Sequence, residues 1–410
     1  MKLLIKNPKS VITCSSYGKP SKRGKEMSDV GMRYQVDILI EDGIIKDISH
    51  DIMDDDADIF DASDKIVLPG FIDPHTHLIF AGTRENEFAM RSRGMTYSQI
   101  AEAGGGILNT VGKVRETNKP KLRQQASKYV DRMLSHGSTT IEIKSGYGLD
   151  FKNEIKILEV ANELRDQSIP DIVVTFLGAH AIPPEFSDRR IDYIDLITKE
   201  LIPYISKKKL ADFCDVFCDK GFFTIDETRE ILQVASLHGL RPKLHADELE
   251  PTGAVALGIE LNAVSVDHLE KISIEEIQLL ANSDTLAVLL PSVPAYLRTT
   301  PAPAREMIDA GCAVAIASDF NPGTSMVDNM PTIMWLAICL NKMTVEEALN
   351  AATINSAAAV GKSSVLGSIE VGKQADLIIS NAPDYSYIPY HFTHNTISHV
   401  IKNGKLLEFS

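Results

Sequence analysis

The chain has 410 residues, of which 44% are hydrophobic and 24% are charged, and its formal net charge at pH 7 is −14. This composition is ordinary for a globular protein, and the negative charge argues against nucleic acid and anionic membranes as partners. Five scattered cysteines without a CxxC pair favour a reducing cytoplasm over a disulfide framework. We expect a cytoplasmic protein, because the first ten residues lack the apolar core of a signal peptide and no apolar run could span a bilayer.

The N-terminal 68 residues contain short apolar or alternating runs separated by polar turns, a pattern typical of β-strands. Within them, Glu41-Asp42-Gly43 predicts a hairpin turn. The polar and charged segment 18–31 predicts a loose loop. Residues 368–382 and 399–407 return to this hairpin texture near the end of the chain. We therefore expect residues 1–68 and 362–410 to pair into one small β domain.

Between these ends, residues 69–361 alternate apolar strand-like runs with helix-like segments, which indicates βα units and a parallel sheet. Eight such units over about 290 residues fit the size of a (β/α)₈ barrel of the TIM type. Gly104, Gly105 and Gly106 interrupt the long segment between the first two runs and predict either a lid or a plain turn. The eight runs are 70–73, 139–143, 172–177, 213–217, 242–245, 263–266, 286–290 and 313–317.

The first run leads into His75-Thr76-His77. Residues two apart in a strand point to the same face, so both imidazoles can be directed at one point. Two neutral imidazole nitrogens make half of a site for zinc or iron. A single HxH pattern is equally consistent with two polar residues at the end of a strand. Only further candidate ligands at the ends of other strands would favour the metal site.

Further candidate ligands follow other strands of the predicted barrel, whose carboxyl ends carry the chemistry of this fold. His180 follows the third run, His245 ends the fifth, His268 follows the sixth and Asp319 follows the eighth. Five of the eleven histidines thus fall at strand ends. Together they predict a metal site.

This order of histidines and aspartate resembles the amidohydrolase superfamily, metal hydrolases built on a (β/α)₈ barrel with a β-sandwich beside it. Within the superfamily, the segments PGFIDPHTHLIFAGTRENEF, IEIKSGYGL, TFLGAHAIPPEF, DVFCDKGFF, KLHADE and ASDFNPGTS resemble the imidazolonepropionases. These enzymes hydrolyse the cyclic amide C–N bond of 4-imidazolone-5-propanoate to N-formimino-L-glutamate in histidine degradation. The resemblance also implies a homodimer, and it makes the small domain a β-sandwich.

The resemblance implies one zinc or iron ion per chain, held by His75, His77, His245 and Asp319. Relatives with two metals bridge them by a carboxylated lysine on the fourth strand, and residues 213–217 contain no lysine. Lys220 lies beyond that strand and is interpreted as a structural or surface residue. Lys144 lies on the second strand, which is the wrong strand for a bridge.

Catalytic roles follow from the same resemblance. Glu248 stands three residues after His245, at the place of the proton shuttle, and a carboxylate there can take a proton from water and pass it to a leaving nitrogen. Asp319 shares the proton transfers, and His268 polarises the carbonyl and stabilises the oxyanion. The alternative for Glu248 is a carboxylate on a surface loop.

The substrate residues depend most on the resemblance. Arg84, just after the first strand, could bind a carboxylate with two parallel hydrogen bonds, although it could also be a plain surface charge. One rival function is deamination of a purine or pyrimidine ring, which a carboxylate-binding arginine disfavours. The other is a non-catalytic barrel scaffold, which the complete ligand set disfavours. The implied substrate-binding residues are Arg84, Tyr147, His180, Glu248, Asn321, Gly323 and Thr324.

Overall fold

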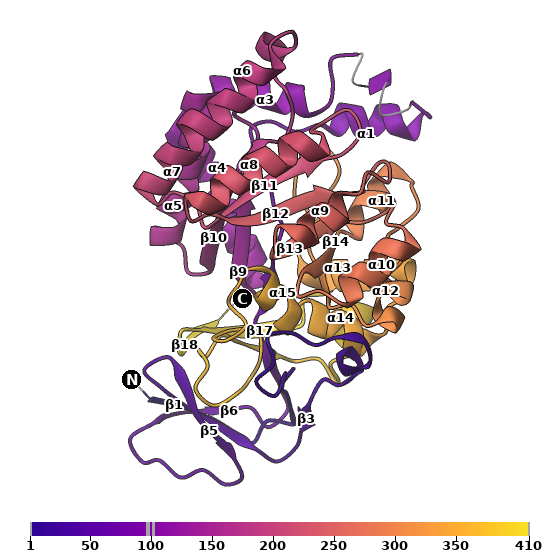
Figure 1. The fold of residues 1–410 in the computed structure, drawn as a ribbon. Coiled ribbons are helices and arrows are strands. Elements are labelled where there is room, and N and C mark those ends of the chain that lie inside the picture. Colours follow the sequence, from indigo (N-terminus) through magenta and orange to yellow (C-terminus); the bar gives the residue numbers. More distant parts are fainter. Residues whose placement is uncertain (1, 96–98, 101–102, 409–410) are drawn as a thin grey trace.

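The computed structural model describes residues 2–95, 99–100 and 103–408, and it shows a barrel of parallel strands beside a smaller β domain that holds the first and last strands (Figure 1). All eight predicted barrel strands are present, and each pairs in parallel with the next one along the chain. They are β8 (Phe71–Asp73), β9 (Ser138–Lys144), β10 (Asp171–Ala179), β11 (Phe213–Cys218), β12 (Arg241–Ala246), β13 (Ser265–His268), β14 (Leu286–Leu289) and β15 (Val314–Ile316).

The barrel closes at a seam between its first and last strands. Just beyond β8 and β15, the backbone nitrogen of Asp319 donates to the oxygen of His75 at 3.0 Å. The nitrogen of His77 donates to the oxygen of Phe320, also at 3.0 Å, and Thr76 forms a parallel bridge with Phe320. The segments that carry three predicted metal ligands therefore also join the two edges of the sheet.

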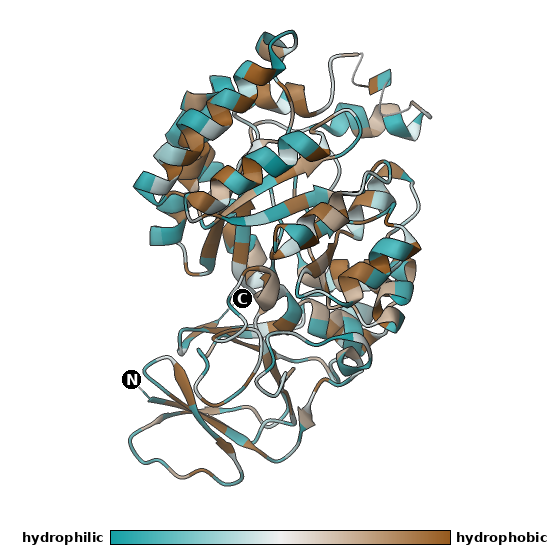
Figure 2. Ribbon diagram, viewed as in Figure 1, coloured by the Kyte–Doolittle hydropathy of each residue, from teal (hydrophilic) through white to brown (hydrophobic). Residues whose placement is uncertain are grey.

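Helices surround the barrel, and each mixes hydrophilic and hydrophobic residues (Figure 2). In α4, Leu122, Ala126, Val130 and Met133 are buried at spacings of three and four, which places them on one face. The described helices are α1 (Glu85–Ser92), α3 (Ile107–Glu116), α4 (Lys119–Ser135), α5 (Phe151–Gln167), α6 (Arg190–Asp195), α7 (Ile202–Lys208), α8 (Ile225–Leu237), α9 (Ala254–Glu260), α10 (Ile274–Ala281), α11 (Ser292–Leu297), α12 (Ala304–Ala310), α13 (Met330–Asn341), α14 (Val345–Ala351), α15 (Ile354–Ala359) and α16 (Tyr387–Tyr390).

The small domain is a sandwich of two sheets, as predicted. Ile38 and Val67, from different sheets, share one apolar core with Leu377 and Ile401 from the end of the chain. Strands from the two ends pair directly, because β7 runs antiparallel to β16. One sheet has the order β5 (Ile44–Ser49), β4 (Asp37–Glu41), β1 (Lys2–Lys6) and β6 (Asp58–Asp61). The other has the order β18 (Lys405–Glu408), β17 (Ile397–Lys402), β16 (Leu377–Ser380), β7 (Ile66–Pro69), β2 (Ser10–Ile12) and β3 (Met32–Arg33).

The predicted hairpin turn joins β4 and β5, where Asp42 and Gly43 both have positive φ. The domain boundaries at residues 68/69 and 361/362 stay predictions. Among the described helices, none combines the length and the apolar character needed to cross a membrane.

The prediction of a loose loop at residues 18–31 is wrong. The Lys22 nitrogen donates to Asn355 Oδ1 at 2.8 Å, and Asn350 Nδ2 donates to the Met27 oxygen at 2.8 Å. Both asparagines are fully buried in α14 and α15. The segment is therefore tied to the barrel by side chains from far along the chain, which its own polar composition does not reveal.

Candidate metal centre and substrate pocket

Three histidines meet inside the carboxyl end of the barrel. His75 and His77 lie just beyond β8 and His245 lies in β12, and all three are buried. One ring nitrogen from each lies within 4.8 Å of the others, and the Nε2 atoms of His75 and His77 are 3.3 Å apart. The structure therefore brings together the three histidines that the sequence predicts as ligands.

The hydrogen bonds of two of these rings direct lone pairs at the centre. His75 Nδ1 donates to Asp267 Oδ2 at 2.6 Å, and His245 Nδ1 donates to Asp215 Oδ1 at 3.1 Å. With the proton on Nδ1, each Nε2 carries a lone pair. His245 Nε2 is buried without a hydrogen-bond partner among the described residues. Burial and the neighbouring positive charges hold the pKa of His75 well below its usual value, so the His75 ring fits a cation and not a proton.

Asp319, the fourth predicted ligand, lies across the seam beside two of these histidines. Its Oδ1 lies 3.5 Å from His75 Nε2 and 3.4 Å from His77 Nε2. Burial raises the pKa of this carboxyl to about 6, because an ionised carboxylate is costly to bury without compensation. Asn321 Nδ2 donates to its Oδ2 at 2.9 Å, and Thr324 Oγ1 donates to the same oxygen at 3.3 Å. Three imidazoles and one carboxylate are a donor set that zinc and iron both accept.

An acid and a base lie next to this centre. Glu248 Oε2 is 3.6 Å from His268 Nε2, and Glu270 Oε2 is 3.6 Å from His268 Nδ1. Burial raises the pKa of Glu248 to about 7. Burial acts to lower the pKa of His268, but Glu248 and Glu270 raise it to about 10. His268 also has a φ of 84°, a conformation that is rare for a side chain of this size and is found preferentially at functional sites.

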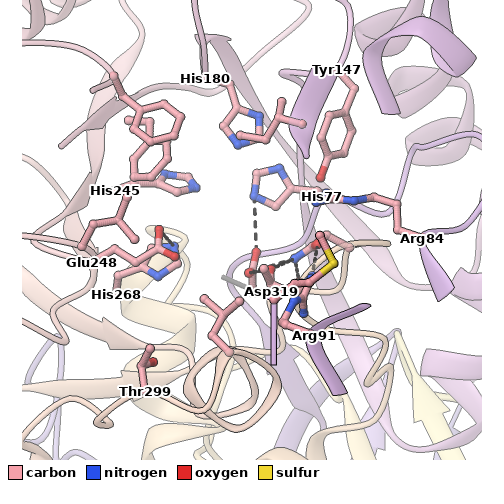
Figure 3. Close-up of a pocket in the computed structure, with 18 residues that line it drawn as sticks. His77, Arg84, Arg91, Tyr147, His180, His245, Glu248, His268, Thr299 and Asp319 are labelled. Atoms are coloured by element: carbon pink, nitrogen blue, oxygen red, sulfur yellow. Dashed lines mark hydrogen bonds and ion pairs between the residues drawn. The ribbon is translucent and has the colours of Figure 1, made fainter. Parts of the chain in front are cut away.

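The ligands open onto a cavity of about 360 Å³, which is within the range of small-molecule sites. Figure 3 shows His77, His245, His268 and Asp319 around its central space, with Arg84 and Arg91 at one side. Its apolar walls come from several loops. They include Met95, Ile107, Phe217, Phe222, Leu249 and Leu297.

Arg84 lines this cavity and is only 7% exposed, so it is not a plain surface charge. Its Nε and Nη2 both donate to Glu87 Oε2, at 2.9 and 2.7 Å. The other edge of the guanidinium, at Nη1, abuts Gly323, where a Cβ atom would lie only 2.1 Å away. Glu87 also accepts from the Gly106 nitrogen at 3.2 Å, so the triple-glycine turn is tied to the arginine.

Tyr147 and His180 line the cavity above His77 in the view of Figure 3, with Tyr147 on the side of Arg84. The His180 ring stacks on His77 at a centroid distance of 5.1 Å, and its Nδ1 donates to the Gly146 oxygen at 3.0 Å. Burial lowers the pKa of His180 to about 3, so the ring is neutral and its Nε2 can only accept a hydrogen bond.

Comparison with known proteins agrees with this arrangement. A model of the amidohydrolase family matches residues 66–407. The chain is 45% identical to the imidazolonepropionase of Geobacillus thermodenitrificans (strain NG80-2) over 413 residues, covering 99% of this chain and 97% of the relative. It is 44% identical to the imidazolonepropionase of Parabacteroides distasonis over 411 residues, covering 99% and 98%. The chain belongs to the amidohydrolase family and, within it, to the imidazolonepropionases.

Solved amidohydrolases share the fold. The atrazine chlorohydrolase of Arthrobacter aurescens TC1, solved in complex with zinc, superposes with a TM-score of 0.73 at 18% identity, covering 99% of this chain and 95% of that one. An amidohydrolase from an environmental sample of the Sargasso Sea superposes with a TM-score of 0.71 at 20% identity, covering 99% and 92%. At these identities, the likeness concerns the fold.

In this amidohydrolase, most of the predicted site residues line one cavity. Gly323 is not among the described residues of the cavity wall and instead lies behind Arg84. Lys220 is largely exposed and pairs with Glu250, as its interpretation as a surface residue implies. The predicted residues that line the cavity are His77, Arg84, Tyr147, His180, His245, Glu248, His268, Asp319, Asn321 and Thr324.

The sequence reasoning missed a set of charged side chains beneath the metal ligands of this amidohydrolase. They lie inside the barrel and have no exposed side-chain surface. A partial signal for them exists, because all of them except Asp215 lie two residues from another polar or charged residue of the same strand. They are Glu142, Lys144, Asp215, Lys243 and Asp267.

Proposed function

We propose that this protein is an imidazolonepropionase that hydrolyses the cyclic amide C–N bond of 4-imidazolone-5-propanoate to N-formimino-L-glutamate. The observation that carries the proposal is a single cavity with metal-type ligands at its base and the buried guanidinium of Arg84 on its wall. A small ring with a carboxylate tail matches both features. A purine or pyrimidine ring, the substrate type of a deaminase, offers no carboxylate to Arg84.

His75, His77, His245 and Asp319 are assigned to one zinc or iron ion. When bound, the ion supplies Lewis-acid chemistry that activates a water and the ring carbonyl. The donor set supports either metal, because imidazole and carboxylate are ligands for both.

Glu248 is assigned the proton transfers. Its raised pKa of about 7 places the carboxyl near the pH of its surroundings, where a group can both accept and return a proton. Glu248 takes a proton from the attacking water and delivers it to the ring nitrogen that leaves. Asp319, whose pKa is about 6, shares these transfers.

His268 is assigned to the carbonyl oxygen. The acids on both sides favour its protonated form, so its Nε2 is a charged donor. A donor that is already in place where negative charge develops stabilises the transition state more than the ground state. Glu248 and Glu270 flank the His268 ring on both sides, so the donor is in place before the tetrahedral centre forms.

The remaining residues bind the substrate. His180 Nε2 can only accept, so it suits a ring N–H of the imidazolone. Tyr147 lies beside it over His77. Asn321 and Thr324 orient the Asp319 carboxylate through the hydrogen bonds described above, and Gly323 leaves space for the guanidinium of Arg84.

We also assign the protein to the cytoplasm, as a homodimer without nucleic acid or membrane partners. The acidic net charge and the resemblance to imidazolonepropionases support this assignment. Size determination in solution together with cell fractionation would test it.

The test of the reaction is product identification. The protein is incubated with 4-imidazolone-5-propanoate and, separately, with a panel of other cyclic amides and aminated purines and pyrimidines. We expect N-formimino-L-glutamate by NMR and mass spectrometry, and no product after metal removal by a chelator. Ammonia release from an aminated ring, without turnover of the imidazolone, would instead establish the deaminase.

A further inference from the structure

The metal ligands rest on a layer of fully buried charges in the barrel interior. Five side chains from β9, β11, β12 and β13 form it, and none has exposed surface. Charged side chains are rarely buried to this extent, because removing them from water is costly unless they are paired. We therefore asked what these buried charges do for the metal ligands above them. The members of the layer are Glu142, Lys144, Asp215, Lys243 and Asp267.

Two of its carboxylates hold the metal-binding imidazoles. Asp267 accepts from His75 Nδ1 at 2.6 Å, and Asp215 accepts from His245 Nδ1 at 3.1 Å. Asp215 Oδ1 also accepts from the backbone nitrogen of His245 at 3.1 Å. A carboxylate that accepts from the far nitrogen of a ligand imidazole fixes its tautomer and its orientation.

Lys144 contacts both of these carboxylates. Its Nζ lies 2.8 Å from Asp215 Oδ2 and 3.5 Å from Asp267 Oδ2. A third contact, to Glu142 Oε2 at 3.1 Å, holds the ammonium from the side. Asp215 and Asp267 each accept a hydrogen bond from a ligand histidine and also pair with Lys144. The lysine therefore links the two carboxylates that orient His75 and His245, which come from different parts of the barrel.

We propose that Lys144 positions the metal-binding histidines, by tying Asp215 and Asp267 together beneath them. This role rests on the metal site proposed above. Lys144 is a positioning residue and touches neither the cavity nor the metal ligands' Nε2 atoms. Lys144 lies in β9, His245 lies in β12 and His75 lies just beyond β8. Through the two aspartates, one lysine side chain therefore sets the distance between these two histidines.

Lys243 offers a matched comparison. It is equally buried and lies in the same layer, with its Nζ 2.9 Å from Glu142 Oε1 and 3.3 Å from the Pro74 oxygen. Among the described residues, no ion pair within 4 Å joins it to Asp215 or Asp267. Removing Lys243 therefore deletes one positive charge from the layer, as removing Lys144 does, but leaves the ion pairs of Lys144 with Asp215 and Asp267 in place.

The charge of the layer must be kept constant in the test. Three carboxylates and two ammonium groups leave one excess negative charge, and Asp319 adds a second, which a divalent ion balances. Removing a lysine alone would make the layer more negative and attract a cation, so it would mask the loss of positioning. Glu142→Gln in the same protein cancels this change, because Glu142 contacts both lysines.

The experiment compares two full-length double variants, Glu142→Gln/Lys144→Met and Glu142→Gln/Lys243→Met. Their affinities for Zn²⁺ are measured by competition with a chromophoric chelator, and their Co²⁺ complexes are examined by visible absorption, which reports ligand geometry. We expect the Glu142→Gln/Lys144→Met variant to bind Zn²⁺ about 10- to 100-fold more weakly than wild type, which is the range for the loss of a residue that orients a ligand histidine. Its Co²⁺ spectrum should also change. The Glu142→Gln/Lys243→Met variant should keep the wild-type Co²⁺ spectrum, and its affinity for Zn²⁺ should stay within about threefold of that of wild type.

Circular dichroism and thermal unfolding of the metal-free proteins show whether both variants fold. Equal losses in the two variants, or an unchanged affinity in the Glu142→Gln/Lys144→Met variant, would overturn the role of Lys144 while leaving the metal site in place. Wild-type protein that binds neither Zn²⁺ nor Co²⁺ would overturn the metal site and this role together. If the Glu142→Gln/Lys144→Met variant does not fold, Glu142→Gln/Lys144→Gln and Glu142→Gln/Lys243→Gln replace the two variants, with the same ordering of affinities expected and the same outcomes decisive.

Discussion

Asp219 holds the backbone of Glu248: its Oδ2 accepts from the Glu248 nitrogen at 2.9 Å and from the Leu249 nitrogen at 2.8 Å. Its Oδ1 accepts from the Glu250 nitrogen at 3.2 Å. Asp219 is 3% exposed and follows directly after β11. One buried carboxylate thus fixes the loop that carries the proposed proton shuttle, although Asp219 does not itself line the cavity.

Asp219→Asn should lower kcat more than it raises KM. The amide keeps one acceptor oxygen but turns an N–H group toward backbone donors, so Glu248 shifts from its place. Hydrogen bonds to a charged group contribute roughly 1.5–3 kcal/mol, so a loss of about 10- to 150-fold in kcat is expected, with metal content unchanged. The exposed Asp226→Asn is the control, and equal kinetics in both variants would remove Asp219 from the mechanism.

Glu248→Gln should abolish proton transfer and retain the metal. The side chain keeps its shape but cannot accept a proton, so turnover should fall by about 10²-fold or more. Steady-state kinetics and metal analysis on the same preparation check both parts. Normal turnover in this variant would place the base elsewhere.

Purified protein should carry about one zinc or iron ion per chain, since the described residues contain one cluster of three histidines, with Asp319 proposed as the fourth ligand. His75→Ala and Asp319→Ala should lose the ion and the activity together. Elemental analysis of wild type and variants measures this directly. Two tightly bound ions per wild-type chain would contradict a mononuclear centre.

Arg84→Ala should raise KM by about 10- to 150-fold for 4-imidazolone-5-propanoate, the range for a charge-assisted hydrogen bond of roughly 1.5–3 kcal/mol. Arg84→Lys should also be impaired, because an ammonium lacks the planar fork. An imidazolone without the carboxylate should be hydrolysed equally well by wild type and variant. Glu87→Gln serves as the control for the lost ion pair, and a similar loss on both substrates would make Arg84 a structural residue.

Asn350→Ala should destabilise the protein without changing the kinetics of the folded fraction. Its side chain is buried and donates to the oxygens of Met27 and Asp29. Without it, the Met27 oxygen loses this donor, while the Asp29 oxygen keeps the one from Lys22 Nζ. Leaving buried groups unsatisfied costs about 1–3 kcal/mol, measurable as a lower unfolding midpoint in denaturant. An unchanged midpoint would show that the 18–31 segment contributes little to the stability of the barrel.

The sequence predicts the barrel well because its strands are apolar runs that alternate with helix-like segments. The histidines at these strand ends could be assigned because a barrel brings all its carboxyl ends together. The small domain was predictable only as strands from both ends. Which strands share a sheet, as β7 and β16 do, depends on contacts between distant segments.

Other features could not be predicted from local pattern. Lys144 and Glu142 stand in one strand and signal only that their side chains point inward. Their partners Asp215 and Asp267 lie on strands far along the chain. The pairing of Arg84 with Glu87 and the anchoring of residues 18–31 likewise depend on which neighbours the fold supplies. The composition of a segment does not show which other parts of the folded chain pack against it.

The hydrogen bonds between His75 and Asp319 across the barrel seam have a consequence for the newly made chain. Synthesis delivers His75 and His77 early and Asp319 only after seven further strands have emerged. An ion that needs both sides cannot be held tightly by a chain whose eighth strand is missing. Tight metal retention would therefore distinguish finished molecules from truncated ones, and a chelator would loosen the molecule first where its two edges meet.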